Sequence, residues 1–266
     1  MKICIDCGHY GKYNQSPIQK KYWESEMTWK LGHYLGDELI KFGVSVIQTR
    51  TNQATDMALE SRGKKAKGCD LFISIHSNAC DSSSTDYPLA CCNADKNKVS
   101  AELGLKLAQA VGNLMGCKQS ARIIQRVGSN NKDWYGVLRG AKSVGVNGIL
   151  LEHGFHTNLM NANWLLIDDN LKKLAKAEAE IIYEYFQGST STSTDFQSYQ
   201  IKVTSDDGFV NIRKTPKFED GDIVGKIENS NIKYTIVEET TVDNVKFGKL
   251  KSGVGWIALS CTTKVV

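Results

Sequence analysis

Four short apolar runs constrain the fold of this chain more than any other feature of its sequence. Ile, Leu, Val and Phe follow one another in these runs without clean alternation, which is typical of strands buried on both faces of a parallel sheet. The runs are KICID (2–6), VSVIQTR (44–50), DLFISIH (70–76) and GILLEH (148–153). We therefore expect a central sheet with both faces covered.

Helical patterns occupy the intervals between the runs. Residues 24–42 carry an apolar side chain at every fourth position, which makes one stripe on a helix, and Gly43 gives the expected stop. Residues 98–115 repeat this pattern, and residues 161–187 predict a last long helix. The alternation predicts an α/β domain with a mostly parallel sheet, right-handed crossovers and helices on both faces.

The composition changes abruptly after residue 187. Residues 188–198, GSTSTSTDFQS, predict a flexible linker because Gly, Ser and Thr bury too little surface to fold. Residues 199–266 show short strand-like segments separated by turn residues, the pattern of a small all-β barrel. The segments are YQIKVT, GFVNIR, YTIVEET, VKFGKLK and GVGWIAL. We expect two domains, 1–187 and 199–266, joined by this linker.

Composition excludes several classes of protein. With 41% apolar and 23% charged residues, the chain has the composition of a soluble globular protein. Its net charge of +4 forms no basic stripe of the nucleic-acid-binding kind, and no apolar stretch is long enough to cross a membrane. No secretion signal follows Met1, so synthesis in a cytosol is the expectation.

The eight cysteines predict reduced thiols, because their spacing is irregular and most lie in apolar segments. The CIDC motif has the spacing of redox and zinc sites. Side chains alternate between the faces of a strand, however, so Cys4 and Cys7 are expected on opposite sides of the sheet. We interpret both as structural.

Side chains with catalytic chemistry follow three of the predicted strands. The first strand ends at His9 and the third at His76. The fourth ends at Glu152, and Glu24 opens the first helix. Functional groups gather at the carboxyl ends of strands in an open parallel sheet. Topology therefore predicts two histidines and two carboxylates on one rim, although no local motif such as H-E-x-x-H is present.

These residue types fit a catalytic zinc site, which takes three nitrogen or oxygen ligands and leaves a fourth position open. His9, Glu24 and His76 would hold the metal and lower the pKa of its bound water to about 7. Glu152 would accept the proton of that water and pass it to the leaving nitrogen of an amide. Each residue alone also fits a plain structural role, as a rim histidine or a first-turn acid.

The remaining histidines are interpreted as structural. Glu152 and His153 face opposite ways in an extended strand, so only one of them serves the rim. His156 is interpreted as structural because His9 and His76 already supply the two histidines of the site. His33 lies inside the first predicted helix and has no companion there.

Residues 1–187 resemble the zinc-dependent N-acetylmuramoyl-L-alanine amidases of the amidase-3 family. The resemblance rests on IDCGHYG, DLFISIHSNA and VLRGAKSVGVNGILLEHGFHTN, which stand in the family's order. SIHSNA and LLEHGFHTN are the most specific pieces, matching S-I-H-x-N-A and E-x-G-F-x-x-N. The resemblance implies a six-stranded α/β fold, zinc as the cofactor, and cleavage of the amide between the lactyl group of muramic acid and the first stem-peptide residue.

The resemblance also assigns roles by position. It makes Glu152 the catalytic glutamate and gives the metal ligands as His9, Glu24 and His76. Glu26 is a near neighbour, but the helix stripe and the distance to Gly43 favour Glu24.

The chain departs from the family pattern in three places that do not include the proposed ligands. His153 replaces a residue that is commonly apolar, and the segment 57–70 is shorter than is typical. The loop 80–97 carries unusual cysteines and could alter substrate contacts.

Residues 199–266 resemble a bacterial SH3-type wall-binding module. GFVNIRKTP is similar to that family's L-N-V-R-x-x-P, and GVGWIAL is similar to its terminal G-x-x-G-W-V segment. A small barrel with an unknown partner stays an alternative. Trp256, Tyr234 and Phe247 could line a groove for peptide or glycan, or fill the core.

An amidase linked to a wall-binding module resembles a phage endolysin that lyses a Gram-positive host, because tethering raises the effective concentration near an insoluble substrate. Such an enzyme is made in the host cytoplasm and reaches the wall after the membrane is permeabilised. The alternatives are a bacterial autolysin of the same activity, a zinc carboxypeptidase on stem peptides, and a non-catalytic wall-binding protein. The carboxypeptidase needs an arginine clamp, and Arg139 is interpreted as a packing residue.

Overall fold

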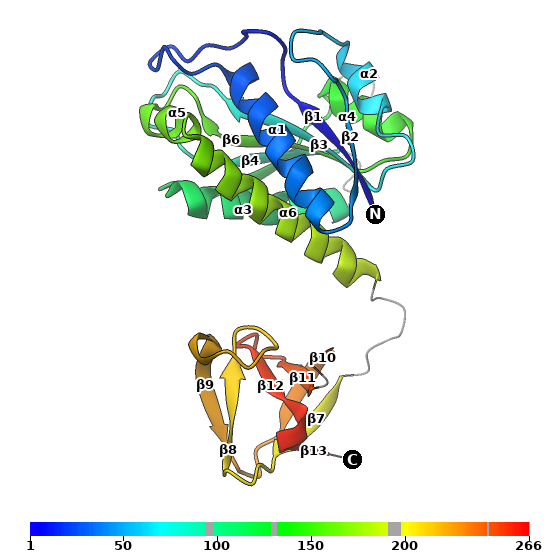
Figure 1. The fold of residues 1–266 in the computed structure, drawn as a ribbon, viewed down its shortest axis with the longest axis vertical. Coiled ribbons are helices and arrows are strands. Elements are labelled where there is room, and N and C mark those ends of the chain that lie inside the picture. The colour runs from blue at the N-terminus through cyan, green and yellow to red at the C-terminus, as the bar shows by residue number, and fades with distance from the viewer. Residues whose placement is uncertain (94–97, 129–131, 191–197, 244, 266) are drawn as a thin grey trace. The chain divides into compact units, whose positions relative to one another are not determined.

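The computed structural model describes residues 1–93, 98–128, 132–190, 198–243 and 245–265. The chain divides into two units, Met1–Thr190 and Ser191–Val266 (Figure 1). Helix α6 (Asp168–Thr190) extends into the first residues of the predicted linker 188–198. The linker residues 191–197 lie outside the described part of the chain, as do residues 94–97 of the loop 80–97.

A six-stranded mixed sheet forms the centre of the first unit, in the order β2–β1–β3–β6–β4–β5. β4 pairs with β6 in antiparallel fashion, and the other neighbouring pairs are parallel. The strands are β1 (Lys2–Cys7), β2 (Ser45–Gln48), β3 (Leu71–Asn78), β4 (Leu89–Cys92), β5 (Arg122–Gln125) and β6 (Gly148–Phe155). The mostly parallel pairing agrees with the prediction, and six is the number of strands that the resemblance implies.

Four of these strands are predicted from the sequence, and two are not. The four predicted runs correspond to β1, β2, β3 and β6. β4 (LACC) and β5 (RIIQ) have four residues each, and neither is among the predicted apolar runs, whereas the equally short β2 lies within the seven-residue run VSVIQTR. The antiparallel pairing of β4 therefore has no counterpart among the sequence predictions.

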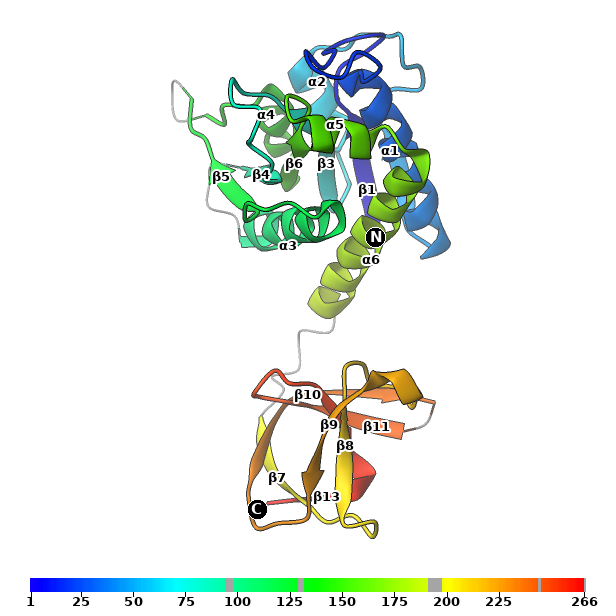
Figure 2. The same cartoon turned by 90° about the vertical axis from the view of Figure 1, so that its left-hand side faces the viewer.

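Helices cover both faces of this sheet, as Figure 1 and Figure 2 show. On one face, helices α1 (Glu24–Lys41), α3 (Lys98–Met115) and α6 pack with β1 and β3 in a single core. On the other face, Val137 and Ala141 of α4 (Gly136–Ser143) pack on Phe72 and Leu150 of the sheet. Helix α2 (Leu59–Lys64) packs against α4.

The single helix predicted over 161–187 is wrong, because this segment belongs to two helices. Helix α5 (Leu159–Leu165) is capped at its N-terminus by Asn158, whose side chain accepts a hydrogen bond from the Asn161 N–H at 3.1 Å. Helix α6 begins afresh with Asp168 and Asp169, acids that the positive end of the helix dipole favours.

The two cysteines of the CIDC motif lie on opposite faces of the sheet, as predicted. Cys4 packs in the core on the α4 side. Cys7 faces α1, where a Cβ added to Gly32 would lie 2.4 Å from the Cys7 sulfur. All eight cysteines are free, and burial raises the pKa of the Cys4 thiol to about 12, which is typical of an inert core thiol.

The second unit contains a seven-stranded antiparallel sheet, in the order β13–β7–β10–β11–β12–β8–β9. Ile201, Ile236 and Ile257 belong to its buried core. The strands are β7 (Tyr199–Val203), β8 (Phe209–Arg213), β9 (Ile223–Glu228), β10 (Tyr234–Val242), β11 (Val245–Leu250), β12 (Trp256–Ala258) and β13 (Thr262–Lys264). All five predicted segments are strands, β9 and β13 are additional, and the SH3-type barrel stays a prediction.

The three aromatic residues singled out in this unit have different surroundings. Phe247 is buried, and Tyr234 packs against the core. Trp256 is partly buried, with the Lys249 ammonium 5.3 Å from its ring. Across the described parts of both units, no helix combines the length and apolar character that crossing a membrane requires.

Candidate metal and catalytic site

A pocket of about 370 Å³ opens at the carboxyl ends of β1, β3 and β6. The four residues predicted to meet on this rim all line it: His9, Glu24, His76 and Glu152. Topology alone therefore places these side chains correctly. Leu59, Val137 and Leu150 add an apolar wall.

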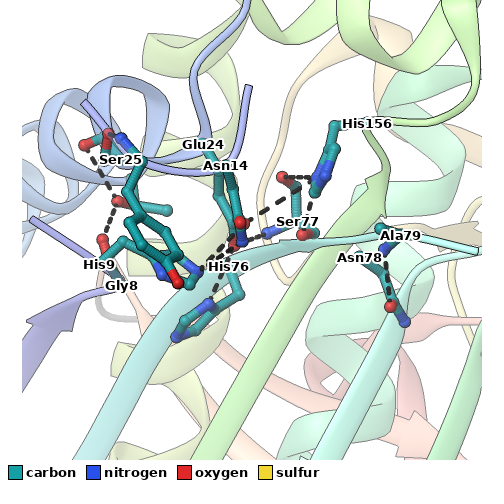
Figure 3. Close-up of polar contacts among 12 residues, drawn as sticks. Gly8, His9, Asn14, Glu24, Ser25, His76, Ser77, Asn78, Ala79 and His156 are labelled. Atoms are coloured by element: carbon teal, nitrogen blue, oxygen red, sulfur yellow. Dashed lines mark hydrogen bonds and ion pairs between the residues drawn. The ribbon is translucent and has the colours of Figure 1, made fainter. Parts of the chain in front are cut away.

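Three of these residues bring candidate ligand atoms within 4.8 Å of one another, namely His9, Glu24 and His76. Glu24 Oε2 lies 3.1 Å from His9 Nε2, and Glu24 Oε1 lies 3.0 Å from His76 Nδ1. Figure 3 shows how the three side chains converge, with Asn14 beside them. We call these three residues the metal cluster.

The end of β1 places His9 through a close backbone approach. A Cβ added to Gly8 would lie 2.4 Å from His76 Cε1, so only glycine allows this contact. The Gly8 carbonyl accepts a hydrogen bond from the Thr28 hydroxyl at 2.7 Å, which fixes the turn to α1. His9 itself has a φ of 60°, a left-handed conformation that a non-glycine residue keeps only where its surroundings enforce it.

Glu24 is 1% exposed, and its carboxylate is fully engaged. Oε1 accepts a hydrogen bond from the Ser77 N–H at 2.9 Å, and Oε2 accepts one from the Asn14 amide at 2.7 Å. Burial by itself raises the pKa of Glu24, but the hydrogen bonds and charges of His76 and His9 outweigh it. The pKa is therefore well below its usual range, and the group is ionised.

Glu152 lies beside His76 in the β3–β6 register, and its environment differs from that of Glu24. Its buried Oε2 has no hydrogen-bond partner among the described residues. Burial raises the pKa of Glu152 well above its usual range, and the charge of Glu24 raises it further. This carboxyl group is free to exchange a proton with a molecule in the pocket.

His156, interpreted as structural from the sequence, lies in the pocket wall. Its Nδ1 is 4.0 Å from Glu24 Oε2 and 3.0 Å from the Ser77 hydroxyl, to which the Tyr22 hydroxyl donates at 2.7 Å. Burial lowers the pKa of His156, which favours the neutral ring. It follows the end of β6, beyond a bulge in the β3–β6 register, so side-chain alternation along the strand gave no signal for it in the sequence.

His153 is structural, as predicted, and 0% exposed on the opposite face of β6. Its Nε2 lies 2.8 Å from Glu178 Oε1 on α6, and its Nδ1 lies 3.0 Å from the His76 carbonyl oxygen. Burial lowers the pKa of His153, but the charge and hydrogen bond of Glu178, together with backbone hydrogen bonds, outweigh this effect and raise it. The pair supports β3 directly behind the metal cluster.

Three further side chains considered from the sequence lie outside the metal cluster. His33 lies 2.8 Å from the Trp29 carbonyl oxygen on its own helix. Glu26 is 4.0 Å from Lys12. Arg139 bonds Glu60 at 2.9 Å and the carbonyls of the loop before α4, so its interpretation as a packing residue is confirmed.

The metal cluster fits zinc in its donor chemistry. Two imidazole nitrogens and one carboxylate oxygen are a typical protein set for a catalytic zinc ion with an open position. Glu152, whose buried Oε2 has no hydrogen-bond partner among the described residues, lines the same pocket. Fold and site together define an α/β protein with a candidate metal site and a buried carboxyl group beside it. The N-acetylmuramoyl-L-alanine amidase model matches residues 3–184, and the chain belongs to this family.

Solved structures similar to this chain include three bacterial proteins. The N-acetylmuramoyl-L-alanine amidase from Clostridium difficile 630 has a TM-score of 0.60 at 20% identity, with 72% of this chain and 98% of that chain covered. The catalytic domain of CwlV, an amidase from Bacillus (Paenibacillus) polymyxa var. colistinus, has a TM-score of 0.57 at 20% identity, with 70% and 98% covered.

Cwp6 from Clostridium difficile has a TM-score of 0.58 at 24% identity, covering 69% of this chain but 29% of its own longer chain. At these identities the likeness shows the fold. No curated protein matches the chain.

Proposed function

We propose that the first unit is a zinc-dependent N-acetylmuramoyl-L-alanine amidase. It hydrolyses the amide between the lactyl group of N-acetylmuramic acid and L-alanine of the stem peptide. The observation that carries this proposal is the meeting of the metal cluster with the unpartnered carboxyl oxygen of Glu152 in one pocket. Membership of the amidase family supports the choice of bond.

His9, Glu24 and His76 would hold the zinc ion. Zinc, when bound, supplies Lewis-acid chemistry toward water and the amide carbonyl. Asn14 and the Ser77 N–H fix the carboxylate of Glu24, so the donor atoms are ordered by the protein itself.

Glu152 moves the proton. As a general base it accepts a proton from the attacking water at its carboxylate, and as a general acid it passes that proton to the amide nitrogen. An amide nitrogen leaves poorly unless it is protonated, so the reaction needs this donor. The raised pKa of Glu152, caused by burial and then by Glu24, suits the donor half of this cycle.

The apolar wall orients the substrate and excludes water from the reacting bond. Leu59 and Val137 come from α2 and α4, which pack against each other at close range. Beside this apolar wall the local dielectric constant is low, so the electrostatic interaction of the Glu152 carboxyl with a substrate is stronger than it would be in water.

For the second unit we propose wall binding by an SH3-type module. The domains are then 1–187 and 199–266, with 188–198 as a linker that keeps the amidase near insoluble peptidoglycan of a Gram-positive wall. The arrangement supports a phage endolysin, made in the host cytoplasm and active on the wall after membrane permeabilisation. A bacterial autolysin of the same activity is the alternative origin.

A carboxypeptidase and a non-catalytic wall-binding protein have less support. A carboxypeptidase needs a cation for the terminal carboxylate, and Arg139 is committed to Glu60 and to backbone carbonyls. A non-catalytic wall-binding protein would have no need of a free carboxyl beside a metal cluster.

The test uses the full chain on purified Gram-positive peptidoglycan, with and without a zinc chelator. We expect new N-terminal alanine without new reducing sugars, and we expect chelation to abolish it. New reducing ends or internal peptide ends would mean that a different bond is cut.

Variants separate the roles of the residues. Glu152→Gln should keep zinc, measured by metal analysis, and lose hydrolysis, whereas His76→Ala should lose both. Glu24→Gln should weaken zinc binding, and Glu26→Gln, a change two residues away on the same helix, is its matched control. Retained turnover in Glu152→Gln would overturn the proton-transfer step.

A further inference from the structure

Three aromatic rings stand in a row from the metal cluster to the surface. The Tyr13 ring stacks on His9 with a centroid distance of 4.9 Å and an interplanar angle of 15°. The Tyr10 ring follows at 6.1 Å and 23°. His9 in turn meets His76 edge to face at 5.0 Å. We call Tyr10 and Tyr13 the tyrosine row.

The tyrosine row is exposed although its backbone is fixed. Tyr13 and Tyr10 are 49% and 38% exposed. The Tyr13 N–H donates to the Ser25 hydroxyl at 2.9 Å, and the Tyr13 carbonyl accepts from the Ser25 N–H at 3.3 Å. The same hydroxyl donates to the Gly11 carbonyl at 2.8 Å. A rigid loop that presents aromatic rings to solvent beside a catalytic pocket has the construction of a binding surface.

The ring faces of the loop carry no charge, and its one cation, Lys12, is largely exposed and lies near other groups. Lys12 is the charged residue between the two tyrosines, and its ammonium lies 5.9 Å from the Trp23 ring and 4.0 Å from Glu26. The Asn14 amide stands where the row reaches the metal cluster, 3.2 Å from His9 Nε2. The row therefore offers flat aromatic rings that lead to an amide group.

A pyranose ring matches this surface better than a stem peptide does. Its C–H face is apolar and flat, its rim carries hydroxyl and N-acetyl groups, and it has no charge. The stem peptide is flexible and carries carboxylates, which would seek free cations. The apolar wall of Leu59 and Val137 is part of the same pocket and is available to the peptide side of the bond.

We propose that the tyrosine row is the glycan subsite of this enzyme, on which the muramic acid side of the substrate stacks. This inference rests on the proposed amidase function and names the side of the pocket on which the sugar lies. Tyr13 has a second task, because its stack on His9 holds a metal ligand whose backbone is in the left-handed region. The Tyr13 side chain would then both bind the sugar and orient the metal ligand His9.

The experiment compares zinc-loaded full-length variants on two soluble substrates. One is an N-acetylglucosaminyl-N-acetylmuramoyl peptide, and the other is a lactyl peptide with the same amide and no sugar. Tyr10→Ala should raise KM for the sugar substrate by about two- to tenfold, the range of one aromatic contact, and leave kcat and the sugar-free substrate unchanged. Phe42→Ala, which removes an exposed ring stacked on Tyr183 at 4.7 Å, is the matched control.

Tyr13 has its own readout. Tyr13→Ala should raise KM for the sugar substrate and also weaken zinc binding by about two- to tenfold in a competition titration. Tyr13→Phe should restore both, because the structure records no hydrogen bond of the Tyr13 hydroxyl within the described residues. Unchanged KM in both alanine variants, or an equal rise for the sugar-free substrate, would overturn the proposal.

Direct binding separates this inference from the proposed activity. The peptide-free disaccharide, titrated calorimetrically into the wild type and into Tyr10→Ala, reports on the subsite without turnover. Loss of binding in the variant supports the subsite even if the wild type cuts a different bond. Equal binding in a wild type that does cut the amide refutes the subsite and leaves the amidase function standing.

Discussion

The buried pair of His153 and Glu178 gives the sharpest test of how the first unit supports its site. Both side chains are essentially unexposed, and they meet at 2.8 Å behind β3 and β6. His153 also lies 3.0 Å from the His76 carbonyl oxygen, so it joins α6 to the strand that carries a candidate metal ligand. We consider the substitution Glu178→Leu.

The expected loss of stability depends on His153, which Glu178→Leu leaves buried without its ion-pair partner. Breaking a buried ion pair costs about 3–5 kcal/mol when the remaining charge stays buried. His153 can deprotonate, which reduces the loss toward the ~1–3 kcal/mol of a buried group without its hydrogen bond. We therefore expect about 3 kcal/mol near pH 6, which lowers Tm by roughly 6–12 °C for a unit of this size.

The loss should depend on pH in a defined direction. Burial lowers the pKa of His153, but Glu178 outweighs it, and the folded-state pKa is raised above the unfolded value of about 6.5. A histidine whose pKa is raised on folding stabilises the folded state fully at pH values below its pKa in the unfolded chain. This stabilisation is lost as the pH rises through its pKa in the folded protein. The difference between wild type and Glu178→Leu should therefore be larger at pH 6 than at pH 9.

The assay is urea denaturation of wild type and variant at both pH values. Glu180→Leu, two residues further along the same helix and partly exposed, is the control and should change stability by less than about 0.5 kcal/mol. The double variant His153→Leu, Glu178→Leu should lose less than the sum of the singles, because no polar partner is left unpaired. A loss below about 1 kcal/mol at pH 6, or a loss that grows with pH, would refute the reasoning.

Three further predictions concern packing, thiols and the second unit. Gly63→Ala should destabilise the first unit by about 1–3 kcal/mol, because the new Cβ would lie 2.0 Å from the Val137 carbonyl oxygen. Gly112→Ala has room within α3 and should be neutral or stabilising. Denaturation of both variants measures the difference. Burial raises the pKa values of Cys4, Cys91 and Cys92 to about 12, so mass spectrometry should show these thiols resisting alkylation at pH 8 until the protein unfolds. A chain ending at Thr190 should keep activity on soluble substrate and lose binding to sedimented walls, and equal wall binding would contradict the proposed module.

The elements that the sequence predicts are those whose pattern is long enough to be read locally. β1, β3 and β6 are continuous apolar strands of six to eight residues, and α1 and α3 each show four or five turns of one apolar stripe. β4 and β5 have four residues, and their place in the sheet depends on partners far along the chain. Such short strands are specified by tertiary contacts rather than by their own pattern.

The meeting of the candidate site residues on one rim was predictable from a topological rule, whereas their proposed roles rest on the family resemblance. His9, His76 and Glu152 stand at the carboxyl ends of parallel strands, where that rule places functional groups. The supporting groups were not predictable, since Asn14 reaches Glu24 from a loop and Ser77 does so through its backbone. His156 enters the pocket wall beyond a bulge in the β3–β6 register, where Gly154 adopts a φ of 74°.

Glu24 and Glu152 show why residue type alone does not define a catalytic role. Both are buried glutamates in the same pocket, and desolvation acts on both in the same direction. Glu24 has two histidines, an amide and a backbone N–H around its oxygens, so its charge is stabilised and it suits a cation. Glu152 has an oxygen without a partner and a neighbouring negative charge, so it favours the protonated form and suits proton transfer. The sequence places both carboxylates on the rim, and the surrounding contacts suit one to holding a cation and the other to exchanging a proton.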